Sequence, residues 1–331
     1  AGKGIWSSGS SECFVSGQTV MNTIRRIPLG IAQTNGGCPK SKAKVLHVQA
    51  DEDHVHKQTG GTALAKLVYT TSGYAELSGR RKRLSDVRYI AGLYEDNETL
   101  CQEVYESIDN AYDIDSVERL YVYGDGAPWI RSLAEYLGAT FLLDKYHINK
   151  YIKECLAFCP KLRGELWKAV NSFDLNATKK VFREAKKAAE TDAERKRVAK
   201  CRRYLVGNWD GVLAWKEQAE YVVGCSAEGH VSHVLSARLS SRPMAWGDEG
   251  IDRMAKLRAM KANDLSVEEY VLQQAKRNPT LAKAIQYAIP VQREKLRKAS
   301  GEVFGNMPAL RGSTWSLRKA LRSISTMVTS I

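Results

Sequence analysis

Apolar residues in the first third of the chain fall into three short runs. The runs are "KVLHVQADEDHVHKQ", "TALAKLVYTTSGYAEL" and "VRYIAGLYED", and the first ends in a group of acidic residues. Runs of this length, rich in β-branched and aromatic residues, are typical of β-strands. The basic stretch "RRKRLSD" lies between the second and third runs and predicts a hairpin tip or loop. Because no helical period separates the runs, we expect an antiparallel meander.

The next part of the chain alternates between helical and strand patterns. "NETLCQEVYESIDNAYDI" places Leu100 and Val104 on one helical face, with Asn97 as the predicted N-cap. "VERLYVYGDG" and "ATFLLD" predict two strands, and the segment between them predicts a short helix opened by Pro128 and closed by Gly138. The element order is β-β-β-α-β-α-β. It predicts an α/β fold in which an antiparallel meander continues into parallel strands of one mixed, five-stranded sheet.

Residues 147–222 show helical periods and no strand pattern. This block is rich in Lys and Arg and interrupts the sheet core, so we expect an all-helical insertion. "CSAEGHVSHVLSARLS" predicts a further helix after it, and a basic helical tail continues to residue 331.

These patterns divide the chain into five parts. The parts are an N-terminal linker with the remnant of a DNA-binding helical segment (1–44), a first part of the sheet core (45–146), the helical insertion (147–222), a closing helix of the core (223–260) and a basic helical C-terminal region (261–331). In the first part, Ser16 is the expected N-cap of a short amphipathic helix that stops at Pro28.

The balance of charge points to an anionic polymer as partner. Lys and Arg number 50 against 37 Asp and Glu, which gives a net charge of +13 and a pI near 9.3. The apolar stretches are far shorter than the ~18 residues of a membrane span, and no signal-peptide pattern opens the chain. We therefore expect a cytoplasmic protein that binds nucleic acid and no membrane.

Cysteine and histidine spacing gives little support for a metal site of the zinc type. The seven cysteines are odd in number and show no CxxC pair, which argues against a disulfide framework or a zinc ribbon. His230 and His233 lie three residues apart near Cys225, but no convincing fourth ligand accompanies them. We interpret them as packing or phosphate-facing residues.

Three acidic residues stand where apolar runs end. In an open α/β sheet ligands bind beyond the carboxyl ends of strands, and Asp51, Asp125 and Asp144 are expected there. Carboxylates that converge at such an edge can hold Mg²⁺, and two such ions can stabilise the attacking and leaving oxygens of a phosphoryl displacement. The excess of positive charge would then hold the phosphate backbone that the acids repel.

Structural interpretations of these acids remain open. The "GDG" around Asp125 is also an ordinary turn, and an Asp at a strand end often forms an Asx-turn or a helix cap. Asp51 competes with Glu52 and Asp53, because side chains alternate across a strand and only one parity faces the site. We favour Asp51 over Asp53. Trp129 either stacks on an unpaired base or packs on the sheet, and we favour packing.

Several motifs in this order resemble a known family. They are the acid of "VQADEDHV", the acid of "GDGAPWI", the Asp-x-x-His of "LDKYH", a helical insertion and "CSAEGHVSHVLSARLSSRPMAWGDEGIDRMAKLR". Together they are similar to the DDE transposases of the ISLre insertion-sequence family and, more distantly, to Mutator-like transposases. The resemblance covers roughly residues 16–330. One departure is "ADEDH", which replaces the commoner Asp-Gly pattern at the first acid.

The resemblance implies a ribonuclease H-like fold with three catalytic, metal-binding acids. On this chain they correspond to Asp51, Asp125 and Glu228, with the last acid after the helical insertion. Asp144 and His147 match the Asp-x-x-His motif and would orient DNA or support the second acid. Without the resemblance, Glu228 would be interpreted as a residue favoured by the helix dipole. The small residues around it would let its helix approach the sheet edge closely.

The function that follows as an expectation is DNA transposition. Two Mg²⁺ ions, with Mn²⁺ as a substitute, would serve cleavage at element ends and strand transfer into target DNA by a homo-oligomer. The alternatives are a nuclease of the same fold without strand transfer, and an inactive DNA-binding transposase relic. The side chains expected to contact the DNA backbone are Arg80, Arg81, Lys82, Arg83, Lys145 and Lys150.

Overall fold

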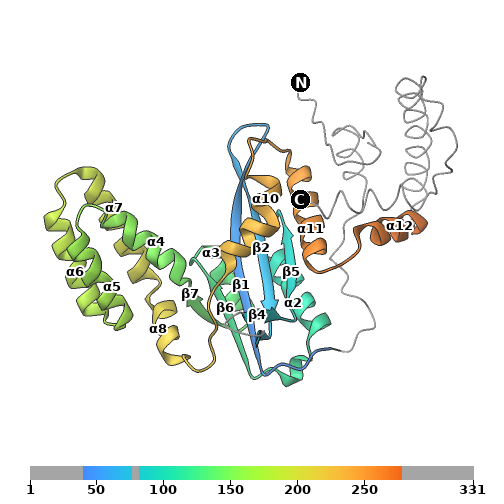
Figure 1. Ribbon diagram of the computed structural model, residues 1–331, viewed down its shortest axis with the longest axis horizontal. Helices are drawn as coiled ribbons and strands as arrows, with labels where there is room; N and C mark the ends of the chain where they lie inside the picture. Colours follow the sequence, from blue (N-terminus) through green and yellow to red (C-terminus); the bar gives the residue numbers. More distant parts are fainter. Residues whose placement is uncertain (1–39, 77–81, 278–331) are drawn as a thin grey trace, which may run out of the picture. The chain divides into compact units, whose positions relative to one another are not determined.

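The computed structural model describes residues 40–76 and 82–277, and a five-stranded mixed sheet lies at its centre (Figure 1). The strands run in the order β5-β2-β1-β6-β7. They are β1 (Val45–His56), β2 (Thr62–Thr71), β5 (Arg88–Gly92), β6 (Arg119–Gly124) and β7 (Thr140–Leu143). β1, β2 and β5 pair antiparallel, whereas β6 and β7 pair parallel to β1. The predicted α/β class, with a meander that continues into parallel strands, is confirmed.

A separate two-stranded sheet shows that one predicted strand is in fact two strands. β3 (Gly73–Glu76) pairs with β4 (Lys82–Ser85), so the run "TALAKLVYTTSGYAEL" is two strands, and part of the predicted basic loop is a strand. Thr71 holds the chain at the break, because its hydroxyl donates to the carbonyl oxygen of Ser85 at 2.6 Å and accepts from the backbone N–H of Gly73 at 3.2 Å. The chain therefore leaves the main sheet immediately after β2.

One face of the sheet packs on helices that bury an apolar core. The helical elements are α2 (Asn97–Ala111), the 3-10 turn η1 (Ile114–Ser116) and α3 (Pro128–Tyr136). Leu100 and Val104 of α2 are fully buried, as the periodicity predicted. The N-cap is Asp96 and not Asn97, since the Asp96 carboxylate accepts a hydrogen bond from the backbone N–H of Thr99 at 2.7 Å.

The opposite face of the sheet carries buried polar side chains and a second group of helices. These are α9 (Ala227–Val231), the π-helical turn η2 (Ser232–Ser236), α10 (Ala237–Leu239) and α11 (Asp248–Ala262). α9 contacts β1, and α11 contacts β5 and β2. Side chains alternate along β1, so His47, Gln49, Asp51 and Asp53 are buried together on this second face.

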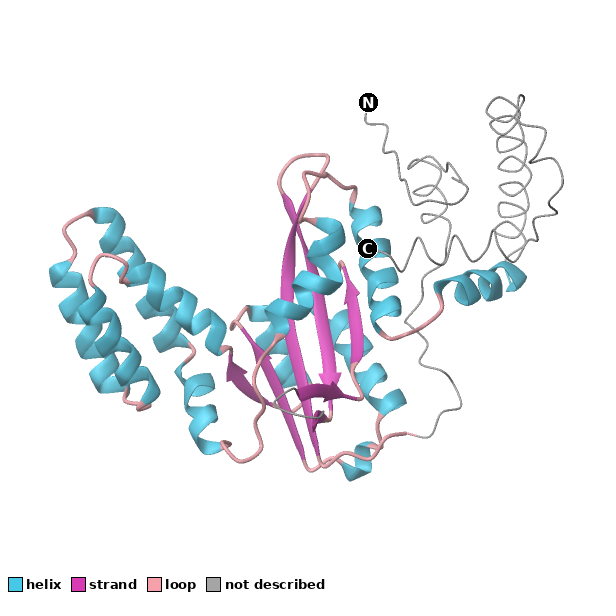
Figure 2. Ribbon diagram, in the orientation of Figure 1, coloured by secondary structure: helices cyan, strands magenta, loops and turns pink. Residues whose placement is uncertain are grey.

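Five helices connect β7 to the second group of helices (Figure 2). They are α4 (Lys145–Cys155), α5 (Pro160–Asn171), α6 (Leu175–Ala188), α7 (Asp192–Gly207) and α8 (Trp209–Glu217). The helical periods of this segment are therefore present as helices. No strand occurs between residues 145 and 217, all of which the structure describes.

The chain divides into two compact units. One comprises residues 30–263, and the other combines residues 1–29 with 264–331. Of the second unit the structure describes residues 264–277, which include α12 (Val267–Arg277). The helix predicted between Ser16 and Pro28 lies outside the described residues. Within the described ranges, every helix is too short or too polar to cross a membrane.

Candidate functional site

Two of the predicted acids follow neighbouring parallel strands. Asp125 comes directly after β6, and Asp144 comes directly after β7. The backbone N–H of Asp144 donates to the carbonyl oxygen of Gly124 at 2.8 Å, which joins the two strand ends. Both acids therefore stand at the carboxyl edge of the sheet, where ligands of α/β folds bind.

The "GDG" turn around Asp125 is fixed by close packing on both sides. A Cβ at Gly124 would lie 2.6 Å from the Ile130 Cδ1 atom of α3. Gly126 has φ +85°, and a Cβ there would lie 2.7 Å from the Asn208 Oδ1 atom. The Asp125 carboxylate accepts a hydrogen bond from the backbone N–H of Ala127 at 2.8 Å, so the Asx-turn interpretation also holds.

Asp51 lies within a strand, and the prediction that its strand ends at the acids is wrong. Parallel pairing between β1 and β6 stops at Gln49, whereas antiparallel pairing with β2 continues to His56. β1 is held past the end of β6 by this second partner. Asp51 therefore lies just beyond the β6 edge, and its side chain faces the same side of the sheet as Gln49.

A buried polar network holds α9 against the sheet. The Gln49 side-chain oxygen accepts hydrogen bonds from the Tyr69 hydroxyl and from the backbone N–H of Ser226, the latter at 2.7 Å. The Gln49 amide donates to the carbonyl oxygen of Gly224 at 3.1 Å. Sequence reasoning missed these residues, although a Gln inside the apolar run "KVLHVQAD" is a signal for a buried hydrogen-bonding role.

The network brings Glu228 to the acids on the sheet. Glu228 lies in the first turn of α9, and its side chain is 49% exposed. Small residues beside Glu228 were expected to let its helix approach the sheet closely. Ala227 fits this expectation because it is buried. Gly229 does not, because a Cβ there would meet no atom within 4 Å. Hydrogen bonding through Gln49 and Tyr69, more than the absence of a side chain, positions this helix.

Asp51, His147 and Glu228 form one compact group. One ligand atom from each residue lies within 4.8 Å of the others, and among the described residues this is the group that could hold a metal ion. The His147 Nε2 atom is 3.9 Å from the Glu228 Oε2 atom. The group contains His147 in the place where the resemblance led us to expect Asp125.

Asp144 fixes the orientation of His147. Asp144 is the N-cap of α4, where one carboxylate oxygen accepts from the backbone N–H of Tyr146 at 3.0 Å. Its other oxygen is 2.8 Å from the His147 Nδ1 atom. A carboxylate bound to one ring nitrogen orients the other nitrogen toward a metal in many metalloproteins. Here the free nitrogen, Nε2, faces Glu228.

The electrostatics of the group are those of crowded, buried carboxylates. Burial is the main cause that raises the pKa of Asp51 to about 7. The hydrogen bond from the Glu52 backbone N–H and the charge of His147 oppose this rise, and the charges of Glu228 and Asp125 add to it. Burial disfavours the charged form of His147, but the hydrogen bond to Asp144 and the charges of Asp51, Asp144 and Asp125 outweigh it and raise the His147 pKa. Asp125 is thus near enough to act on both groups.

This donor set fits a divalent cation. Carboxylate oxygens are the preferred ligands of Mg²⁺ and Mn²⁺, and a cation would offset the burial and the like charges that raise the pKa of Asp51. Asp53, the alternative to Asp51, faces the same side of the sheet but accepts a hydrogen bond from the Ser240 hydroxyl at 2.8 Å. Asp51 is the member of this pair that lies in the group.

Other candidate residues have structural contacts. The Trp129 indole packs under the sheet and donates to the Glu52 carboxylate at 2.8 Å, which confirms the packing interpretation. His230 lies against Tyr69, with ring centroids 4.3 Å apart, and its Nδ1 atom is 2.8 Å from the Tyr89 hydroxyl. These contacts fit the interpretation of His230 as a packing residue.

The residues expected to contact DNA are spread over two regions. Arg80, Arg81 and the side chain of Lys82 lie outside the described residues, and Arg83 is exposed on β4. Lys145 and Lys150 are exposed on α4, the helix that begins at the metal-ligand candidates.

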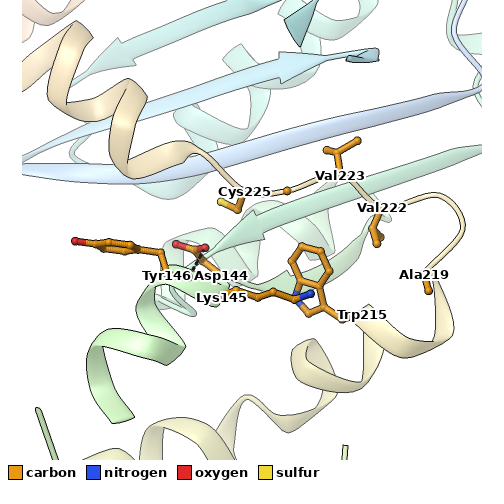
Figure 3. Close-up of a pocket in the computed structure, with 9 residues that line it drawn as sticks. Asp144, Lys145, Tyr146, Trp215, Ala219, Val222, Val223 and Cys225 are labelled. Atoms are coloured by element: carbon orange, nitrogen blue, oxygen red, sulfur yellow. Dashed lines mark hydrogen bonds between the residues drawn. The ribbon is translucent and has the colours of Figure 1, made fainter. Parts of the chain in front are cut away.

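Lys145 borders a cavity beside the acids (Figure 3). The cavity has a volume of about 430 Å³, and Asp144, Tyr146 and Cys225 also line it. Figure 3 shows the Lys145 side chain reaching the Trp215 indole, where its Nζ atom is 3.9 Å from the ring centroid. The cavity therefore places a cation and two aromatic rings next to Asp144.

Comparison with known proteins gives a family. A model of an uncharacterised protein family, UPF0236, matches residues 6–276. Two UPF0236 proteins of Caldanaerobacter subterraneus subsp. tengcongensis are 41% identical over 257 residues and 35% identical over 314 residues. These alignments cover 77% and 94% of this chain, but only 54% and 66% of the relatives. A UPF0236 protein of Streptococcus gallolyticus is 23% identical over 264 residues, which cover 76% of this chain and 57% of that protein.

Proposed function

The chain belongs to the UPF0236 family, and from that premise we propose that it is the catalytic part of a DDE transposase. It would cleave DNA at the ends of a mobile element by metal-dependent phosphodiester hydrolysis and join the freed 3′-hydroxyl to target DNA. One observation carries this proposal. Asp51, Glu228 and a histidine that Asp144 orients form one compact group, at the edge of the sheet where Asp125 follows β6.

The sheet supports a ribonuclease H-like fold as part of the proposal. Three antiparallel strands are followed by two strands parallel to the first, and a helical segment separates β7 from α9. This is the arrangement that the family resemblance implies, with the third acid on a helix after the insertion.

The residues have distinct roles in the proposed reaction. Two divalent cations, Mg²⁺ or Mn²⁺, would stabilise the attacking and the leaving oxygen of the phosphodiester when bound. Asp51, Asp125 and Glu228 would supply the carboxylate oxygens that hold them. Asp144 keeps the Nε2 atom of His147 aimed at the same space, and the half-exposed Glu228 leaves that space open to a DNA strand.

The relatives' names add an independent argument. One name joins four locus names of a single strain, and another joins eleven. A protein whose gene recurs at many positions in one genome is what a self-moving DNA element produces.

The charge of the chain supports DNA as the partner. A net charge of +13 offsets the repulsion between a phosphate backbone and the acidic group. Transposition holds two element ends together, so the proposal includes a homo-oligomer, acting in the cytoplasm on nucleoid DNA.

The decisive experiment removes one carboxylate. Asp125→Asn should abolish cleavage of DNA that carries the ends of the gene's own element, because a carboxylate that binds metal is lost, while DNA binding stays equal or tightens. The exposed Asp115→Asn is the matched control and should retain activity. Equal cleavage by wild type and Asp125→Asn would contradict the assignment of Asp125 as a catalytic, metal-binding residue.

The same assay separates the alternatives. A pre-cleaved end offered with target DNA reports strand transfer. Cleavage without joining identifies a nuclease, and binding without either reaction identifies an inactive relic.

A further inference from the structure

A hollow in the helical insertion is lined by cations. It lies at α6 and α7, which pack against each other in the insertion (Figure 1). Its volume is about 400 Å³, and its lining residues are Asn176, Lys179, Arg183 and Arg202. None of its lining residues within 40–76 and 82–277 is acidic. It is separate from the cavity beside Asp144, with which it shares no lining residue.

Helical spacing places these side chains together. Asn176, Lys179 and Arg183 are three and four residues apart, so they share one face of α6. The opposite face of α6 buries apolar residues such as Phe182, which fixes the direction of the polar face. Arg202 comes from α7, next to the buried Cys201.

The positive charge of the hollow is not neutralised within the described part of the chain. No ion pair within 4.0 Å involves Lys179, Arg183 or Arg202 there, although nearby Arg195 pairs with Asp192 at 2.9 Å. α6 carries five Lys and Arg against one Glu, and α7 carries six against two acidic residues. Like charges three or four residues apart on one helical face repel each other and destabilise the helix. An anionic ligand would offset this repulsion.

We propose that this hollow binds the phosphate backbone of duplex DNA. The lining offers guanidinium, ammonium and amide groups, which are the donors that contact phosphate oxygens. The four described residues that line it include no aromatic ring on which a base would stack, so contact with the backbone is favoured over recognition of a base. The choice of DNA as the anion rests on the proposed function, but binding at this hollow requires no chemistry at the acids.

The test is the salt dependence of DNA binding by the full chain. A triple variant combines Lys179→Gln, Arg183→Gln and Arg202→Gln. Its affinity for a duplex of about 30 base pairs of arbitrary sequence is measured in EDTA and compared with that of the wild type. A plot of the logarithm of the association constant against the logarithm of the salt concentration has a negative slope, and each lost phosphate contact reduces its magnitude by about 0.9. The magnitude should therefore fall by about 2.7 in the triple variant. Raising the salt from 50 to 200 mM should then cost the wild type about 40-fold more affinity than the variant.

A matched variant controls for net charge. Lys153→Gln, Lys161→Gln and Lys168→Gln remove the same charge from exposed positions of the insertion outside the hollow. The slope of this variant should stay within about 1 of the wild type. Equal reductions in both variants would show diffuse attraction and overturn the site. Circular dichroism checks folding, and Arg202→Gln alone, with an expected change of about 0.9, replaces the triple variant if that variant unfolds.

The outcomes separate this proposal from the catalytic one. An unchanged slope in the hollow variant overturns the hollow alone and leaves cleavage at the acids standing. A reduced slope in a protein that never cleaves DNA overturns the catalytic role alone. A single-stranded oligonucleotide of the same length tests the choice of duplex DNA. An unchanged slope with this oligonucleotide supports a duplex site, and a change near 0.7 per removed charge would overturn the restriction to a duplex.

Discussion

At the residue scale, Asp51 combines burial with a requirement for charge. Its side chain is 7% exposed, and burial raises its pKa to about 7. A buried carboxylate near other acids is destabilising without a cation, but a cation can bind only when the carboxyl is ionised. Enzymes place perturbed ionisable groups at functional sites for this reason. Asp51 therefore links the stability of the fold to the chemistry of the site.

This link predicts a specific pH dependence. The folded-state pKa of Asp51, about 7, lies above the ordinary aspartate pKa of 3.8, so between these values the folded chain holds a proton that the unfolded chain releases. Stability should fall as pH rises through this window. Asp51→Asn removes the penalty, and its advantage over the wild type should grow from pH 4 to pH 8 by on the order of 4 kcal/mol. Urea unfolding in EDTA measures it.

The control for that experiment is a variant that loses a surface charge. Asp115→Asn, an exposed Asp, should show no such growth across the same pH range. A constant difference between Asp51→Asn and wild type from pH 4 to pH 8 would contradict the buried-carboxyl explanation.

At the element scale, a glycine lets the helical insertion pack closely against the sheet. A Cβ at Gly211 of α8 would lie 2.7 Å from the Phe141 ring and 3.0 Å from the backbone nitrogen of Leu143. α8 therefore approaches β7 closely, and the Trp215 indole adds a hydrogen bond to the carbonyl oxygen of Leu143 at 2.8 Å. Because Asp144 follows Leu143 directly, this packing also supports the start of α4 and His147.

Gly211→Ala should destabilise the fold by about 1–3 kcal/mol, because the added methyl group overpacks a tight contact. Gly164 of α5 is the matched control, since a Cβ there meets nothing within 4 Å. Gly164→Ala should stabilise by up to about 1 kcal/mol through helix propensity. Chemical unfolding of both variants gives the two signs, and stabilisation by Gly211→Ala would contradict the packing argument.

At the scale of the whole molecule, the site exists only in the folded chain. Asp51 comes from β1, Asp125 follows β6, and Glu228 lies beyond the entire insertion. A ligand that binds the folded and not the unfolded state raises stability, by about 2.7 kcal/mol at 100 times its Kd. Metal binding at this group should therefore be visible in global unfolding.

Thermal unfolding with about 10 mM Mn²⁺ tests this expectation. The wild type should melt a few degrees higher with metal than in EDTA, and Glu228→Gln should lose most of that shift because a carboxylate ligand is removed. Glu217→Gln, an exposed residue of α8, should keep the full shift. An undiminished shift in Glu228→Gln would place the metal elsewhere.

The sequence predicted local structure better than spatial neighbours. Helical and strand periods predicted the meander, the parallel strands and the helices between 145 and 217. They misjudged the end of β1, because antiparallel pairing with β2 carries that strand beyond Asp51. They also missed Gln49, whose importance lies in hydrogen bonds to segments far along the chain.

The sequence by itself determined the kinds of element, the excess of positive charge and the acids worth testing, because each depends on local composition or on the period of a single segment. Only the tertiary structure decided that His147 joins Asp51 and Glu228 and that Arg202 meets the polar face of α6. These neighbours depend on strand order, on the seating of α9 and on the packing of α6 against α7. Such long-range contacts have no period of their own in the sequence.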